Sequence, residues 1–167
     1  WTEVHRVLKD DGIFAFTYHH SRPEGWHSVL EALMVAGFGI TAVHPIKAEM
    51  SVAMPKHQAK EPIDLDIVVA CRKRSQLKAR RWNDDLWGTV SRIAGGQIRR
   101  LRSAGRGLSG NDVRVIVMAQ LIRELSTSDS VETCLTLLDA SGAETESLIN
   151  RLNVPDGHGA GAAENRD

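Results

Sequence analysis

The stretch from Gly12 to His20 constrains the fold of this chain more than any other segment. Its first half is a short apolar run, Ile13 to Phe16, which is typical of a strand buried on both faces. The run then ends in polar and titratable side chains: Thr17, Tyr18, His19 and His20. In open α/β sheets, ligands bind in the crevice outside the carboxyl ends of the strands. The stretch therefore predicts either a ligand-binding strand exit or a core strand that leaves through a polar turn.

The spacing of apolar residues predicts further helices and strands around this strand. The expected elements are a helix over residues 1–9, a second helix after Ser21, and strands over 38–43 and 65–70. Ser21 and Glu24 match a capping box, and Gly37 is placed to end the second helix in a left-handed conformation. Pro45 favours an edge position for the second strand. A parallel pair joined by a crossover helix, followed by an antiparallel return strand, satisfies this order.

Residues after 74 show helical periodicity. A helix is expected from Leu77 to about Arg102, with a break or kink at Gly95-Gly96. Ser109 and Asp112 match a second capping box, and the helix that follows is apolar on most sides, so we expect it to be buried or covered by a partner. Two shorter helices are expected over 129–140 and 143–152. The predicted domains are an α/β part over 1–74, a helical appendage over 75–154 and a disordered tail over 155–167.

Charge is unevenly distributed, although lysine plus arginine and aspartate plus glutamate balance at 21 each. Residues 75–106 carry eight basic and two acidic side chains, whereas residues 107–167 carry four basic and ten acidic ones. The basic segment is a candidate for phosphate contacts, with Trp82 and Trp87 available to stack on bases. The alternative is that its arginines face solvent or pair with the acidic segment that follows.

The two cysteines, Cys71 and Cys134, lie in separate predicted elements and form no Cys-x-x-Cys pair. This usage predicts reduced thiols and no zinc site. No apolar run approaches the length of about 18 residues that a membrane span needs, and no signal peptide is visible. We therefore expect a cytoplasmic protein without a membrane partner or a bound metal.

Several segments resemble a known family. Residues 3–12, Glu-Val-His-Arg-Val-Leu-Lys-Asp-Asp-Gly, resemble the helix-to-strand step of S-adenosylmethionine-dependent methyltransferases. Four further segments narrow the resemblance to large adenine-specific DNA methylases that also carry a zinc ribbon: residues 16–20, 31–38, 45–50 and 71–74. The resemblance covers about residues 1–74. It implies the C-terminal half of a class I, Rossmann-like methyltransferase sheet: the fifth strand at 12–18, the following helix at 26–36, and a closing hairpin of strands 38–43 and 65–70.

The glycine-rich cofactor loop and the Asp-Pro-Pro-Tyr catalytic motif of that family occur nowhere in this sequence. The resemblance therefore assigns no catalytic and no cofactor-binding residue to this chain. It implies the C-terminal part of a DNA methyltransferase acting at adenine N6, with S-adenosylmethionine bound mainly by an upstream half. We expect this chain alone to be inactive. The alternative is a non-catalytic nucleic-acid-binding or interaction module derived from such an enzyme.

The candidate substrate surface lies at the predicted carboxyl edge of the sheet. Tyr18, His19 and His20 are expected to line a pocket for DNA or a flipped base, or else to cover the edge of the sheet. If the two crossover-linked strands run parallel, the loop over residues 51–62 leaves the same edge. That loop adds a second set of candidates, which could contact phosphate or base or simply be solvated: Lys56, His57 and Lys60. A zinc site from His19, His20 and His57 lacks ligands with suitable spacing.

Overall fold

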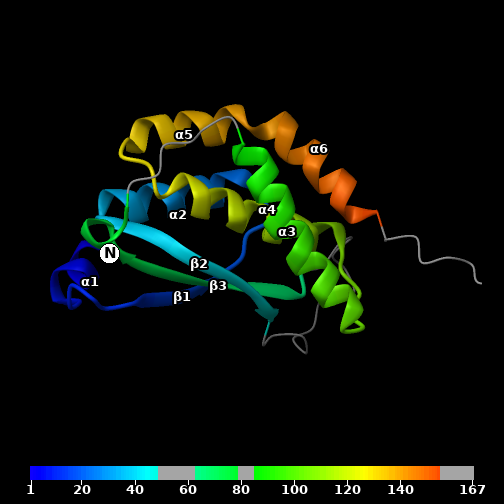
Figure 1. Ribbon diagram of the computed structural model, residues 1–167, viewed down its shortest axis with the longest axis horizontal. Coiled ribbons are helices and arrows are strands. Elements are labelled where there is room, and N and C mark those ends of the chain that lie inside the picture. Colours follow the sequence, from blue (N-terminus) through cyan, green and yellow to red (C-terminus); the bar gives the residue numbers. More distant parts are fainter. Residues whose placement is uncertain (49–62, 79–84, 155–167) are drawn as a thin grey trace, which may run out of the picture.

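The computed structural model describes residues 1–48, 63–78 and 85–154. Within these ranges the protein has one three-stranded antiparallel sheet and six α-helices, which confirms a mixed α/β fold. The helices are α1 (Thr2–Val7), α2 (Pro23–Val35), α3 (Leu86–Ser103), α4 (Gly110–Leu125), α5 (Val131–Ala140) and α6 (Gly142–Asn153). The strands are β1 (Phe14–Tyr18), β2 (Phe38–Lys47) and β3 (Leu65–Lys73), and a 3₁₀ turn, η2 (Arg74–Gln76), follows β3. Helices α2, α4, α5 and α6 gather on one side of the sheet, with α1 at the opposite end of the molecule from α3 (Figure 1).

The sheet has the strand order β1-β3-β2, and β3 is antiparallel to both neighbours. β1 and β2 therefore point the same way, as expected for strands joined by a crossover helix. They do not pair with each other, because β3 lies between them. β2 continues through Pro45, and β3 extends to Lys73, so both strands are longer than predicted. Pro45 is tolerated because β2 lies at an edge of this sheet.

One face of the sheet is covered by helices, and the described residues leave the other face partly exposed. Leu65, Ile67, Val69 and Cys71 of β3 are buried on the covered face. Alternation along β1 leaves Phe14, Phe16 and Tyr18 partly buried on that face, whereas Ala15 and Thr17 are exposed. The prediction that this strand is buried on both faces is therefore wrong for the described part of the chain.

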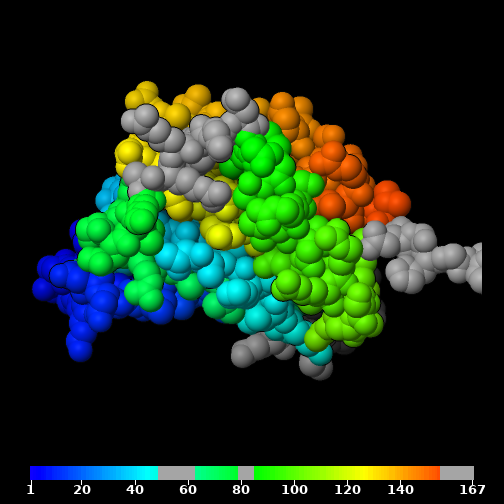
Figure 2. All heavy atoms as spheres, viewed as in Figure 1, coloured from blue at the N-terminus to red at the C-terminus, as the bar shows by residue number. Residues whose placement is uncertain are grey.

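The helices after residue 74 share a hydrophobic core with the sheet. α4 is buried along most of its length, as its apolar sequence predicts, and packs against β2, β3 and α2. The same core contains Trp26 of α2, Val69 of β3, Ile116 of α4 and Leu148 of α6. In the space-filling view, α3 lies directly against both β2 and α6 (Figure 2). The α/β part and the described helices beyond it are therefore joined through one core.

Two local sequence signals are confirmed by the structure. Gly37 has a φ of 85° directly after α2, a conformation that favours glycine. Ser109 caps α4 through a reciprocal capping box with Asp112. Both signals depend only on residues a few positions apart, which is why the sequence reveals them.

Two other local predictions are wrong. Ser21 does not cap α2, because Arg22 is the N-cap residue and makes no side-chain cap bond. α3 runs without a break through Gly95-Gly96. A Cβ added at Gly95 would lie 3.4 Å from Cδ2 of Leu152 in α6, so the glycine permits close helix packing there.

Cys71 of β3 and Cys134 of α5 are buried free thiols, as predicted. Burial raises the pKa of the Cys71 thiol to about 12, so it is protonated near neutral pH and has little nucleophilic character. No helix in the described ranges has both the length and the apolar character that would let it cross a membrane.

Candidate functional site

The exit of β1 is an ordered cluster of rings. The Tyr18 ring packs edge-on against Trp26 of α2, with 5.1 Å between ring centroids, and it stacks on the His20 ring at 6.4 Å. Trp26 Nε1 donates a hydrogen bond of 2.8 Å to the His20 carbonyl. His20 Nδ1 lies 3.0 Å from the backbone of Arg22, within hydrogen-bond distance. The start of α2 therefore fixes the positions of Tyr18 and His20, two of the three predicted site residues at this exit.

Burial raises the pKa of Tyr18 above its ordinary value of 10.0. The phenol is therefore protonated near neutral pH and can donate one hydrogen bond while accepting others. Its ring is held by Trp26, so the hydroxyl is presented from a rigid position. This arrangement suits hydrogen bonding to a ligand at the carboxyl end of β1.

His19 lies on the opposite face of the sheet from Tyr18 and His20. Its Nδ1 contacts the Asp66 carboxylate of β3, and its side chain is 47% exposed whereas that of Asp66 is 19% exposed. The register explains the pair, because Tyr18 lies opposite Ile67 and the next residue on β1 then meets Asp66. A carboxylate at Nδ1 orients the imidazole and leaves Nε2 to face a ligand. The three consecutive candidates are thus divided between two faces.

Asp66 is the residue of this edge that the sequence did not reveal. Nothing near it in the chain indicates a role, and it lies 47 positions from His19. Its only signal is the strand pairing. A pairing of β1 with β3 that aligned Tyr18 with Ile67 would have identified it.

The second set of candidates follows β2. Lys47 pairs with Leu65, so β2 ends at the same edge of the sheet as β1. The last described residues before the loop therefore lie at the same edge of the sheet as Tyr18, as predicted. Lys56, His57 and Lys60 themselves lie outside the described residues. Among the residues that are described, no cluster of three histidine, cysteine or acidic side chains is placed to hold a metal ion.

Residues 86–103 of the basic segment form α3, which carries four arginines and no acidic residue. Trp82 lies outside the described residues. Arg99 and Arg100 are exposed, and neither takes part in an ion pair with another described residue. Arg102 instead donates hydrogen bonds of 3.1 and 3.2 Å to the carbonyls of Val154 and Asn153 at the end of α6. Arg102 thus caps a helix, whereas its two neighbours remain available to a partner.

S-adenosylmethionine, the cofactor implied by the resemblance, does not fit the exit of β1. Nucleoside sites in α/β sheets use a glycine-rich turn for close approach and a carboxylate for the ribose. Here β1 leads into two histidines, and a Cβ at Gly25 would lie 2.4 Å from the His20 ring, so the space above this turn is filled. The one Gly-x-Gly-x-x-Gly pattern in the sequence, Gly105 to Gly110, leads from α3 into α4, so it follows a helix and not a strand as in a nucleoside site. The Asp66 carboxylate at this edge is already bound to His19. The β1 exit therefore offers contacts for a substrate but lacks the glycine-rich turn that this cofactor needs.

Comparisons with models of protein families, with curated proteins and with solved structures found no match to this chain.

Proposed function

We propose that this chain is the C-terminal part of an S-adenosylmethionine-dependent DNA methyltransferase that acts at adenine N6. The observation that carries the proposal is the arrangement of β1, α2, β2 and β3. The segments resembling that family call for a fifth strand, a covering helix and a closing hairpin, and the same three units are consecutive here. Both strands of the hairpin, β3 and β2, lie on the same side of β1 in the sheet.

The other edge of β1 supports the same proposal. Within the described ranges, β1 pairs with β3 alone, so its outer backbone groups have no partner strand. Ala15 and Thr17 are exposed on the open face of the same strand. A fourth strand and its helix, supplied by an upstream half, would pair with this edge and cover these small side chains.

The proposed division of labour follows from the residues present. The upstream half holds S-adenosylmethionine, whose methyl group is transferred to the exocyclic amine of the target base. This chain contributes the substrate edge, where the Tyr18 hydroxyl and the exposed His19 imidazole can contact the base or its neighbours. Trp26 and Asp66 hold those two side chains in position.

The test is methyl transfer by a polypeptide that joins this chain to the upstream segment of its gene. Labelled S-adenosylmethionine is supplied with duplex DNA, and the products are digested and examined for N6-methyladenine. A poly(dG)·poly(dC) duplex, which lacks adenine, is the matched substrate control. Methylation of the adenine-containing duplex only is the expected result. Labelling of both duplexes would contradict the adenine assignment, and labelling of neither would contradict the enzyme.

A non-catalytic nucleic-acid-binding module is the second candidate, and the exposed arginines of α3 favour it. The double variant Arg99→Ala/Arg100→Ala should weaken DNA binding about equally for all sequences and reduce its salt dependence. Arg102 is left intact because it caps α6. The module would be favoured if the joined polypeptide transfers no methyl group but binds DNA in a way that depends on Arg99 and Arg100.

A further inference from the structure

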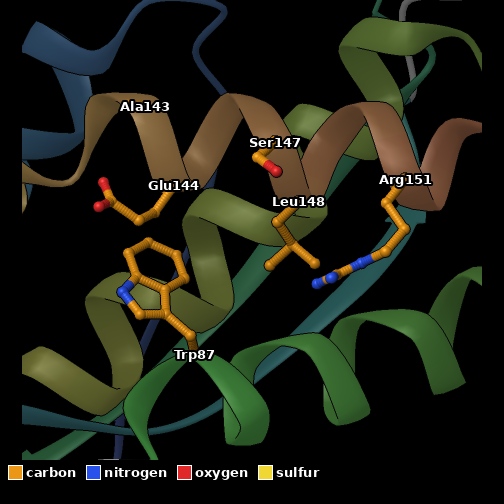
Figure 3. A pocket seen from close by; sticks show the side chains of 6 residues that line it. All are labelled: Trp87, Ala143, Glu144, Ser147, Leu148 and Arg151. Carbon is orange, nitrogen blue, oxygen red and sulfur yellow. The ribbon is translucent and has the colours of Figure 1, made fainter.

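A groove of about 430 Å³ opens between α3 and α6, away from the exit of β1. It is lined by Trp87 from the first turn of α3 and by five residues of α6: Ala143, Glu144, Ser147, Leu148 and Arg151. The Trp87 indole lies below Glu144, while the Arg151 side chain reaches from α6 toward α3 (Figure 3). The groove thus has an aromatic side, a carboxylate and a guanidinium.

The shape of the groove follows from how the two helices pack. α3 comes close to α6 at Gly95, where an added Cβ would touch Leu152. Toward the start of α3, the bulky Trp87 side chain stands between the helices, and the groove opens there (Figure 3). Leu148 is 2% exposed and provides an apolar floor.

The polar groups of the groove share one side of α6. Glu144, Ser147 and Arg151 recur at helical spacing, so the carboxylate and the guanidinium are carried by residues about 10 Å apart along the axis. Both side chains belong to exposed residues. Within the part of the chain that the structure describes, neither forms an ion pair. They are therefore free to bind a ligand that offers a donor at one end and an anion at the other.

The positive charge of α3 favours binding of an anionic group of the ligand. This helix has no acidic side chain, and Arg99 lies with its Nη1 3.3 Å from the Cβ position of Gly95, beside Leu152 of α6. Arg102 adds a second guanidinium at the end of α6. Arg151 is thus at the cationic end of the groove, and Trp87 and Glu144 are at the other.

We propose that this groove binds one nucleotide unit. The base stacks on the Trp87 indole, its exocyclic amine donates a hydrogen bond to Glu144, and its phosphate pairs with Arg151. The unit is either a free nucleotide or one residue of a single strand, since both offer the same base and phosphate. The site is separate from the β1 exit and does not depend on methyl transfer. Glu144 accepts but cannot donate, so it suits the exocyclic amine of adenine or cytosine better than thymine, whose single ring N–H lies between two carbonyl acceptors.

The test measures binding of fluorescein-labelled homopolymers of deoxyadenosine, deoxycytidine and deoxythymidine to the full chain by fluorescence anisotropy. The deoxyadenosine and deoxycytidine polymers should bind more tightly than the deoxythymidine polymer. Trp87→Ala should weaken binding by about ten-fold, the loss expected for one base stack. Arg151→Ala should weaken it several-fold and lower the salt slope by about 0.7. Glu144→Ala should remove most of the preference against thymine.

The matched control is Arg6→Ala, which removes an exposed arginine from α1 at the opposite end of the molecule (Figure 1). It should leave affinity unchanged. Circular dichroism establishes that each variant is folded. If Trp87→Ala does not fold, the variants at the exposed residues Glu144 and Arg151 still test the proposal. Competition by adenosine monophosphate at similar affinity identifies the free nucleotide as the ligand, and failure to compete identifies the single strand. Wild-type affinity in both Trp87→Ala and Arg151→Ala, or no binding of any probe, would overturn the proposal.

Discussion

The carboxylate of Asp112 in α4 accepts a hydrogen bond of 3.2 Å from the backbone amide of Leu65, the first residue of β3. The same oxygen accepts the Asp64 amide at 2.8 Å, and the second oxygen accepts the Ser109 amide at 2.9 Å. Asp112 is only 1% exposed. One side chain therefore caps a helix and fixes the start of the central strand 47 positions earlier in the chain.

Asp112→Ala should lower the free energy of unfolding by about 3 kcal/mol, because buried amides lose a charged acceptor and α4 loses its capping box. Urea denaturation followed by circular dichroism measures the change. Asp11→Ala is the control, since it removes an exposed aspartate and should change stability by less than about 0.5 kcal/mol. Equal stability of the two variants would show that Asp112 does not join the sheet to α4.

Arg102→Ala should lower stability by about 1 kcal/mol, because the last carbonyls of α6 lose their donor. Arg100→Ala removes the same charge from the same helix at an exposed position and should have almost no effect. Thermal melting of the two variants side by side provides the comparison. A larger loss for Arg100 would reverse the roles assigned to these arginines.

The hydroxyl and the ring of Tyr18 are expected to have separable roles. Tyr18→Phe keeps the edge-on contact with Trp26 and should preserve stability, whereas Tyr18→Ala removes it and should cost about 2 kcal/mol. If the hydroxyl contacts substrate, Tyr18→Phe in the joined polypeptide lowers turnover with DNA at unchanged melting temperature. Wild-type kinetics for Tyr18→Phe would restrict Tyr18 to packing.

The protein should lose stability in acid as the ion pair between Arg114 of α4 and Glu146 of α6 is lost. The hydrogen bond from Arg114 holds the pKa of Glu146 below its ordinary value of 4.5. A carboxyl whose pKa is lowered by folding stabilises the protein above its ordinary pKa, and this contribution disappears as pH falls through the folded value. Glu146→Gln should therefore flatten the acid side of the stability profile. The effect stays below about 1 kcal/mol because the pair is partly exposed, and parallel profiles of variant and wild type would refute it.

Local and non-local features differ in how well the sequence reveals them. Gly37 and the Ser109–Asp112 box are defined by neighbours in the chain, and both predictions are confirmed. The insertion of β3 between β1 and β2 depends on strand pairing, as does the contact between His19 and Asp66, so neither was predicted. Gly95 looked like a helix breaker because its packing partner, Leu152, is more than 50 positions away. The groove between α3 and α6 was missed for the same reason, although Trp87 was noted as a stacking residue.

The last prediction is that this chain alone neither binds S-adenosylmethionine nor transfers its methyl group. The exit of β1 lacks the glycine-rich turn that nucleoside sites use, and its carboxylate, Asp66, is bound to His19. The rings of Tyr18 and His20 occupy the space beside it. The edge of β1, which pairs with no other strand in the described ranges, and the exposed Ala15 and Thr17 also favour self-association of the isolated chain. Isothermal titration of the monomeric fraction with the cofactor should give no saturable heat, while the joined polypeptide should bind. Saturable micromolar binding to the isolated chain would mean that a cofactor site lies within these residues, and the proposed division between two halves would be wrong.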